Sequence, residues 1–322
     1  MFKEFIKFLR RHSSLIITTH DWPDADGLGA EIAFSQICRD IGIKCYIINS
    51  KPVPHRYVFL DPEREIGTWE NTGDTFNPKE HAMVILDSSD EFNIGTMKDI
   101  IPLAKEVFMV DHHDHAPAIS IKCMIDSSAS STCEIISELA EATGVTLNMV
   151  SSSAVYAGIA YDTGSFAFPK TSNRTFRAAL KLVDAGVNPY AIYHELNETA
   201  ETGALLLNQR VFSSLKIIDN RIAVQILRKE DMEATGTNIE DAEAFINIPL
   251  KAREIQVSVL VKETSEGQVR CSLRSKGKIN VSRIAQIFGG GGHVTASGFR
   301  SSLGIEETLA RVLEKIRFAP EQ

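Results

Sequence analysis

The feature that most constrains this chain is a set of short apolar runs, each of which ends at acidic or histidine residues. Residues 15–19, 82–86 and 107–110 have the length and composition of buried strands in a parallel sheet. The polar residues that follow these runs are His20, Asp24 and Asp26, then Asp87, then Asp111, His112 and His113. Because ligands bind beyond the carboxyl ends of the strands in an open α/β sheet, we expect these side chains to meet at one edge.

A further acidic residue, Asp162, follows the apolar stretch 154–160. So many anionic groups in one place need cations, and metal ions are the simplest. Carboxylates and imidazoles suit Mn²⁺, Mg²⁺ or a related ion, and no nearby thiolate favours a structural zinc. Two such ions about 3.5–4 Å apart can share a carboxylate and a water, which becomes a nucleophile for attack on phosphorus. The alternative is that Asp24 caps a helix and His20 is a core histidine.

The pattern along the chain predicts an α/β protein. From residue 14 to about 126, strand-like runs alternate with helical patterns, which favours a doubly wound parallel sheet. Residues 132–186 are expected to be mostly helical. After Asn220 the pattern changes to strands at 222–227, 255–261 and 269–273, with helices at 281–288 and 305–316. We therefore expect a catalytic domain over 1–190, a helical linker over 191–214 and a smaller α/β domain over 215–322.

Composition limits the partners of this chain. Its net charge of −8 argues against binding long duplex nucleic acid, because phosphate neutralisation needs many Lys and Arg residues. A short nucleotide at a local cationic site remains open. The five cysteines contain no C-x-x-C pair, which indicates free thiols in a reducing cytosol. The N-terminus lacks a signal-peptide core, and no apolar run approaches the ~20 residues that span a bilayer. We expect a cytoplasmic protein without a membrane partner.

The polar residues also form a recognisable pattern. His20-x-x-x-Asp24-x-Asp26, followed by Asp87, Asp111-His112-His113 and Asp162, resembles the motifs of the DHH phosphoesterase superfamily. The run Gly289-Gly290-Gly291-Gly292-His293, with Arg274 upstream, resembles the DHHA1 domain that accompanies one branch of that superfamily. The closest resemblance is to the nanoRNase A type, oligoribonucleases that also dephosphorylate 3′-phosphoadenosine 5′-phosphate. The resemblance covers nearly the whole chain.

The resemblance implies a role for each residue of the first domain. One ion would be held by His20, Asp24 and Asp87, and the other by Asp26, Asp87, His112 and Asp162. Asp87 would therefore bridge the two ions, of which Mn²⁺ is expected first, with Mg²⁺ or Co²⁺ as alternatives. His113 would face the scissile phosphate, and Asp111 would orient an imidazole without binding metal.

The resemblance also implies a substrate site in the second domain. Arg274 and His293 would bind substrate across a cleft, and Gly290, Gly291 and Gly292 would let backbone N–H groups approach a phosphate. The expected substrates are short single-stranded RNA and dinucleotides. A plain flexible loop is the alternative for the glycine run. Some relatives carry an Arg where this chain has Asn93, so one phosphate contact is in doubt.

Several alternatives stay open at this point. The residues Ser130-Ser131-Thr132 are expected to cap a helix, although its N-terminus could instead bind a substrate phosphate. Asp114 and His115 are expected in a solvated loop. The rival functions are a phosphodiesterase acting on linear or cyclic diadenylate, a RecJ-like exonuclease, a family II pyrophosphatase and a non-catalytic nucleotide sensor. A homodimer is a further expectation that the sequence does not decide.

Overall fold

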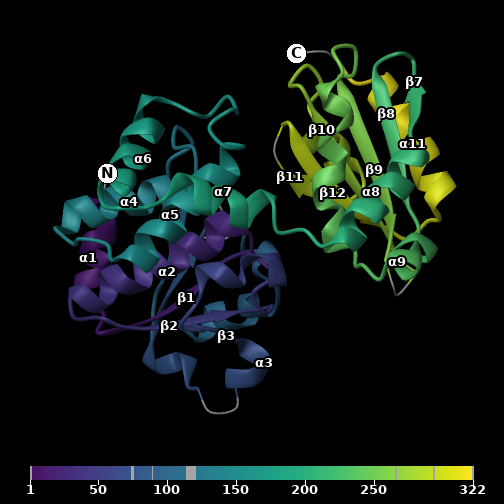
Figure 1. The fold of residues 1–322 in the computed structure, drawn as a ribbon. Coiled ribbons are helices and arrows are strands. Elements are labelled where there is room, and N and C mark those ends of the chain that lie inside the picture. The colour runs from purple at the N-terminus through teal and green to yellow at the C-terminus, as the bar shows by residue number, and fades with distance from the viewer. Residues whose placement is uncertain are drawn as a thin grey trace. The chain divides into compact units, whose positions relative to one another are not determined.

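The computed structural model describes residues 2–73, 76–88, 90–113, 121–264, 267–292 and 294–320. The chain divides into two compact units, Met1–Thr199 and Ala200–Gln322, and the division falls within residues 191–214 (Figure 1). Each unit has its own sheet and its own hydrophobic core. Each is therefore described by itself.

The first unit contains a parallel sheet in the order β3-β2-β1-β4-β5-β6. Its strands are β1 (Ser14–Thr18), β2 (Lys44–Asn49), β3 (Ile66–Thr68), β4 (Ala82–Leu86), β5 (Val107–Asp111) and β6 (Lys122–Ile125). The chain runs outward from β1 to β3, returns to β4 beside β1, and then runs outward on the other side. The predicted doubly wound sheet is confirmed, and its topological switch point lies between β1 and β4.

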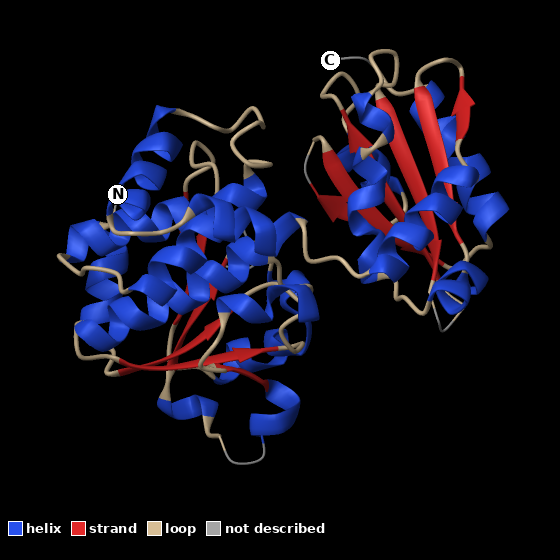
Figure 2. Ribbon diagram, viewed as in Figure 1, coloured by secondary structure: helices blue, strands red, loops and turns tan. Residues whose placement is uncertain are grey.

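Helices cover one face of this sheet (Figure 2). They are α1 (Lys3–Arg11), α2 (Ala25–Asp40), α4 (Thr132–Thr143) and α5 (Met149–Asp162), followed in the chain by α6 (Asn173–Asp184) and α7 (Pro189–Asn197). The short helix α3 (Trp69–Thr72) and the 3₁₀ segments His55–Leu60, Pro78–Glu80 and Glu91–Leu103 complete the unit. Alternate residues of the central strands, such as Ile17 and Ile16, belong to the cores on opposite faces. Burial on both faces explains their continuous apolar sequence.

Local signals explain where the helices between residues 132 and 186 begin and end. The side chain of Ser131 accepts a hydrogen bond from the Glu134 backbone N–H at the start of α4, and Gly144 ends that helix in the left-handed conformation with a φ of +73°. Asn148 caps α5 in the same way, by accepting from the Ser151 N–H. The mostly helical character predicted for this stretch is confirmed, as is the capping function expected at Ser130–Thr132.

The second unit contains a mixed sheet in the order β11-β12-β10-β9-β8-β7. Its strands are β7 (Lys216–Ile218), β8 (Ile222–Leu227), β9 (Val257–Glu263), β10 (Val269–Ser275), β11 (Gly291–Gly292) and β12 (Ala296–Ser301). One face packs against α10 (Val281–Ile287) and α11 (Ile305–Arg317). The other packs against α8 (Thr202–Ser213), α9 (Lys229–Thr235) and the 3₁₀ segment Glu240–Asn247, with a second 3₁₀ segment at Pro249–Lys251. The sheet and helices predicted after Asn220 are present.

No helix within the described residues is both long enough and apolar enough to cross a bilayer.

Candidate metal centre

The acidic and histidine residues of the first unit meet at the carboxyl ends of its central strands. His20 follows β1, Asp87 follows β4, and Asp111 ends β5. Asp24 precedes α2 and Asp26 lies in its first turn, while Asp162 is the last residue of α5. Since β1 and β4 flank the switch point, the cluster occupies the position where open α/β sheets bind ligands.

One group of possible metal ligands consists of His20, Asp24 and Asp87. The His20 Nε2 atom lies 3.7 Å from Asp24 Oδ1 and 3.5 Å from Asp87 Oδ2. Asp24 Oδ1 also accepts hydrogen bonds from the backbone N–H groups of Asp26 and Gly27, at 3.0 and 3.2 Å. Asp24 therefore caps α2, as the alternative interpretation predicted, and also faces the cluster.

A second group consists of Asp26, His112 and Asp162. The His112 Nε2 atom lies 3.0 Å from Asp162 Oδ2, 3.6 Å from Asp87 Oδ1 and 3.9 Å from Asp26 Oδ2. One oxygen of Asp87 thus faces His112, and the other faces His20. Asp87 is the carboxylate that lies between the two groups, and it reaches this position with a left-handed backbone φ of 57°.

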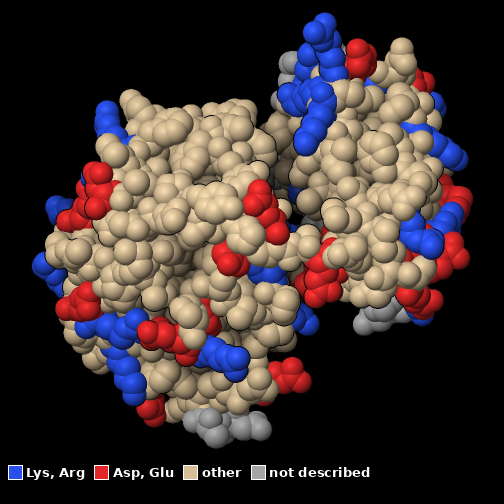
Figure 3. Space-filling view, viewed as in Figure 1, with Lys and Arg blue, Asp and Glu red and all other residues tan. Residues whose placement is uncertain are grey.

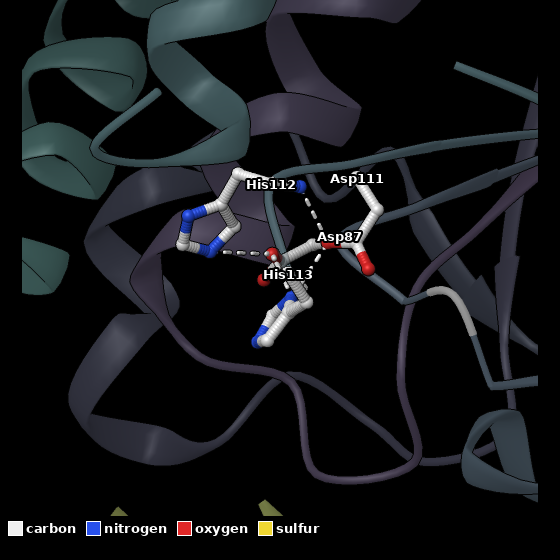
Figure 4. Close-up of side chains that lie close together, drawn as sticks. All are labelled: Asp87, Asp111, His112 and His113. Atoms are coloured by element: carbon white, nitrogen blue, oxygen red, sulfur yellow. Dashed lines mark hydrogen bonds and ion pairs between the residues drawn. The ribbon is translucent and has the colours of Figure 1, made fainter. Parts of the chain in front are cut away.

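The two consecutive histidines have different surroundings (Figure 4). The side chain of His112 is 3% exposed, whereas that of His113 is 30% exposed. Asp111 Oδ1 accepts a hydrogen bond from His113 Nδ1 at 2.6 Å and another from the His112 backbone N–H at 2.7 Å. The carboxylate of Asp111 therefore orients the His113 ring, and it also appears with Asp87, His112 and His113 in a third group of possible ligands.

The N-terminus of α4 donates hydrogen bonds to two of the carboxylates, those of Asp26 and Asp87. The backbone N–H groups of Thr132 and Cys133 donate to the two oxygens of Asp26 at 2.7 and 2.8 Å. The Thr132 hydroxyl donates to Asp87 Oδ1 at 3.0 Å. These amides are therefore used within the protein, which weighs against the alternative that this helix end binds a substrate phosphate.

Close packing of α2 against α5 keeps Asp26 buried. Gly158 on α5 leaves room for this contact, since a Cβ atom there would lie 2.9 Å from Asp26 Oδ1 and 2.3 Å from Cys133 Sγ. A side chain at residue 158 would therefore displace either the carboxylate or the first turn of α4.

Burial and mutual repulsion shift the pKa values of these acids. Burial, together with the charge of Asp162, raises the pKa of Asp26 to about 6, and burial with the charge of Asp24 raises the pKa of Asp162 to about 7. Burial and the charge of Asp26 raise the pKa of Asp87 well above its usual range. Burial is the largest single effect on Asp24 and opposes its ionisation, but His20 and the backbone N–H groups of Gly27 and Asp26 together outweigh it and lower the pKa of Asp24.

This donor set fits divalent cations. Asp26 and Asp87 are buried, and Asp24 and Asp162 are mostly buried beside them, so the charged forms of these four acids repel one another unless a cation lies between them. Oxygen and imidazole donors suit Mn²⁺ and related ions. The residues predicted as ligands from the sequence are thus brought together within one unit, where Asp87 belongs to the first group and lies 3.6 Å from His112 of the second.

Of the residues predicted to bind substrate in the second unit, Arg274 lies on β10 and Gly291 and Gly292 form β11, with β12 between these two strands. Arg274 on β10 pairs with Ala296 on β12, and β12 in turn pairs with Gly291 and Gly292 of β11. Gly290 and Gly292 have a packing reason to lack side chains, since Cβ atoms there would lie 2.2 Å from Gly298 O and 2.5 Å from Ala296 O. A Cβ at Gly291 would meet open space. His293, Asp114 and His115 lie outside the described residues.

Sequence reasoning did not find several supporting residues. Asn49 at the end of β2 accepts from the Thr19 backbone N–H and donates to the buried Glu31 at 2.9 Å, which holds the segment just before His20. Lys170 donates to the His112 carbonyl at 3.0 Å. The contact from Thr132 to Asp87 spans 45 positions of the chain. No pattern in the neighbouring sequence predicts these contacts, although the Ser-Ser-Thr segment did mark the start of α4.

Comparison with known proteins agrees with this fold. The model of the DHH family N-terminal domain matches residues 14–159, and the DHHA1 domain matches residues 219–318. The uncharacterized protein MG371 of Mycoplasma genitalium is 30% identical over 92% of this chain and 89% of its own length. The Bacillus subtilis protein named bifunctional oligoribonuclease and PAP phosphatase NrnA is 27% identical over 92% of this chain and 91% of its own length.

A solved structure shares the fold over nearly the whole chain. The exopolyphosphatase-related protein from Bacteroides fragilis aligns with a TM-score of 0.91 at 24% identity, covering 98% of this chain and 95% of that one. The fold and the carboxylate–histidine cluster define a two-domain α/β phosphoesterase architecture. The chain belongs to the DHH phosphoesterase family and carries a C-terminal DHHA1 domain.

Proposed function

We propose that this protein is a two-metal phosphoesterase that hydrolyses short oligoribonucleotides to mononucleotides and 3′-phosphoadenosine 5′-phosphate to AMP. The observation that carries the proposal is the position of Asp87. Its two oxygens face His20 on one side and His112 on the other, at 3.5 and 3.6 Å. A carboxylate with one oxygen toward each ligand group is what a pair of adjacent cations requires.

The ligand groups suggest how two ions would be held. His20, Asp24 and Asp87 would bind one ion, and Asp26, Asp87, His112 and Asp162 the other. Mn²⁺ is our first choice, because mixed carboxylate and imidazole donors suit it, with Mg²⁺ or Co²⁺ as alternatives. Bound divalent ions would lower the pKa of a water at the site and offset the charge that develops on the phosphoryl oxygens.

His113 and Asp111 would act together on the substrate. The hydrogen bond from His113 Nδ1 to Asp111 Oδ1 keeps a proton on Nδ1 and fixes the plane of the ring. The other ring nitrogen, Nε2, would then face a non-bridging phosphate oxygen, to which an Nε2–H group would donate a hydrogen bond. Such a ring stabilises negative charge on the phosphate as the reaction proceeds.

The substrate class is supported by the relatives and by the charge distribution. Proteins similar to this chain over nine tenths of its length are named oligoribonuclease and PAP phosphatase. On the face seen in Figure 3, Lys and Arg side chains are interspersed with Asp and Glu, apart from one basic group at the upper end of the second unit. A short substrate needs few cations, and we assign its binding to Arg274, His293 and the backbone of Gly290 to Gly292.

We place this activity in the cytoplasm, because the five scattered cysteines indicate free thiols in a reducing compartment. The homodimer expected from the sequence stays a prediction, which sedimentation of the purified chain would test.

The proposed function is tested by a product time course. The substrates are a labelled dinucleotide, a labelled five-mer, 3′-phosphoadenosine 5′-phosphate and cyclic diadenylate, each with Mn²⁺, and the control enzyme is Asp87→Asn. We expect mononucleotides from the first two substrates and AMP from the third, with all products absent for the control. Faster cleavage of cyclic diadenylate than of the dinucleotide would instead assign a cyclic-dinucleotide phosphodiesterase.

A further inference from the structure

The first turn of α4 contacts carboxylates that come from two distant parts of the chain. The Thr132 backbone N–H donates to Asp26 Oδ2 at 2.7 Å, and its hydroxyl donates to Asp87 Oδ1 at 3.0 Å. The next residue, Cys133, donates its N–H to the other oxygen of Asp26 at 2.8 Å. Thr132 is completely buried, so these bonds do not compete with bulk water.

These contacts fix the orientation of both carboxylates without using all of their acceptor positions. An ionised carboxylate has about four acceptor positions, and each oxygen of Asp26 receives one N–H group. Two neighbouring amides on the two oxygens define the plane of the carboxylate. At the same time the positive end of the helix favours its charge. Acceptor positions therefore remain on Asp26 and Asp87 for a cation.

The Thr132 hydroxyl is not needed for the helix itself. Ser131 is the residue that caps α4, by accepting the Glu134 N–H at 3.0 Å. The oxygen that Thr132 contacts is Asp87 Oδ1, the one that faces His112. The branched side chain of Thr has few rotamers, so a buried hydroxyl at this residue is held toward its acceptor.

We propose that Thr132 is a positioning residue for the second divalent cation, which holds Asp26 and Asp87 so that both face His112 and Asp162. The inference rests on the proposed two-metal function and adds a residue outside the ligand set. Partners of metal ligands are typically worth about 10–100-fold in metal affinity or activity. Loss of the Thr132 hydroxyl should weaken binding of the ion that Asp26 and Asp87 share more than binding of the other ion, because Asp24 and His20 have other contacts.

The test uses a pair of substitutions at this residue. Thr132→Val keeps the backbone N–H, the branching and nearly the same volume, but it removes the hydroxyl bond to Asp87. Thr132→Ser keeps the hydroxyl. Thr143→Val is the matched control, since Thr143 lies at the other end of α4 and its hydroxyl donates only to backbone carbonyls, Leu139 O at 2.8 Å and Ala140 O at 3.0 Å.

Mn²⁺ binding is measured by calorimetry and by electron paramagnetic resonance, with kcat measured over a range of Mn²⁺ concentrations. We expect two ions in the wild type, and one of them bound about 10–100-fold more weakly in Thr132→Val. The spin coupling of a metal pair should weaken, and high Mn²⁺ should restore much of kcat. Thr132→Ser and Thr143→Val should resemble the wild type. A merely destabilised fold would lower the melting temperature in EDTA without shifting the Mn²⁺ dependence.

Two results would overturn the inference. Unchanged affinities for both ions in Thr132→Val would show that the hydroxyl does not position Asp87. Equal losses in Thr132→Val and Thr132→Ser would show that packing, and not the hydrogen bond, matters at this residue. If the proposed function itself is wrong, the wild type will bind fewer than two ions, which distinguishes that result from a failure of the Thr132 proposal alone.

Discussion

His113→Ala should separate catalysis from metal binding, because the neighbouring histidines have different contacts. His113 is partly exposed and held by Asp111 at 2.6 Å, whereas His112 is buried and lies 3.0 Å from Asp162. One charge-stabilising donor is typically worth ~10²–10³ in turnover, or about 2.7–4 kcal/mol. We therefore expect His113→Ala to lose kcat by about that factor while it retains both Mn²⁺ ions.

The assay measures bound Mn²⁺ and dinucleotide turnover on the same samples. His112→Ala is the contrasting variant, and we expect it to lose an ion and turnover together. Asp111→Asn should fall between the wild type and His113→Ala, since it keeps the shape of the side chain but weakens the bond to the ring. The reasoning is refuted if His113→Ala loses Mn²⁺ in proportion to its turnover, which would make His113 a ligand.

Three further predictions concern the other parts of the site. Asp87→Ala should abolish turnover more completely than any other single ligand change, because its oxygens face both ligand groups; near-normal turnover in saturating Mn²⁺ would contradict this. The raised pKa values of Asp26, about 6, and Asp162, about 7, mean that protons compete with metal. In the metal-free protein these acids add stability at low pH that is lost as the pH rises through about 6 to 7, so the Mn²⁺-induced rise in melting temperature should grow from about pH 5.5 to about pH 8. A rise that is the same at both pH values would count against these groups as ligands. Arg274→Lys should weaken dinucleotide cleavage strongly, because Lys cannot form two parallel bonds to a phosphate, while a small chromogenic phosphodiester is cleaved nearly as before. An unchanged ratio of the two kcat/KM values would remove Arg274 from the substrate site.

The strand ends of the first unit were predictable because the residues that follow parallel strands all lie at the same edge of the sheet. A run such as residues 82–86 is apolar on both faces, so its end is visible in the sequence, and Asp87 must lie at the carboxyl edge. Helix ends were also predictable, because the residues that cap a helix lie next to it in the sequence. Boundaries generally agreed to within two residues, as for α10, predicted at 281–288 and observed at Val281–Ile287.

Other features depend on contacts that are remote in sequence. Strand β12, Ala296–Ser301, was not predicted, because Ala, Ser and Gly have weak strand preference and its pairing with β10 decides its conformation. The bonds from Thr132 and Cys133 to Asp26 span more than 100 positions. The left-handed backbone of Asp87 likewise has no sequence signature, since it is imposed by the surrounding fold.

Anomalous diffraction from crystals grown with Mn²⁺ tests the central claim most directly. We predict two anomalous peaks about 3.5–4 Å apart in the first unit, each within bonding distance of a different oxygen of Asp87. His20 and Asp24 should lie beside one peak, and Asp26, His112 and Asp162 beside the other. A single peak, or a pair of peaks that Asp87 does not join, would contradict the two-metal centre.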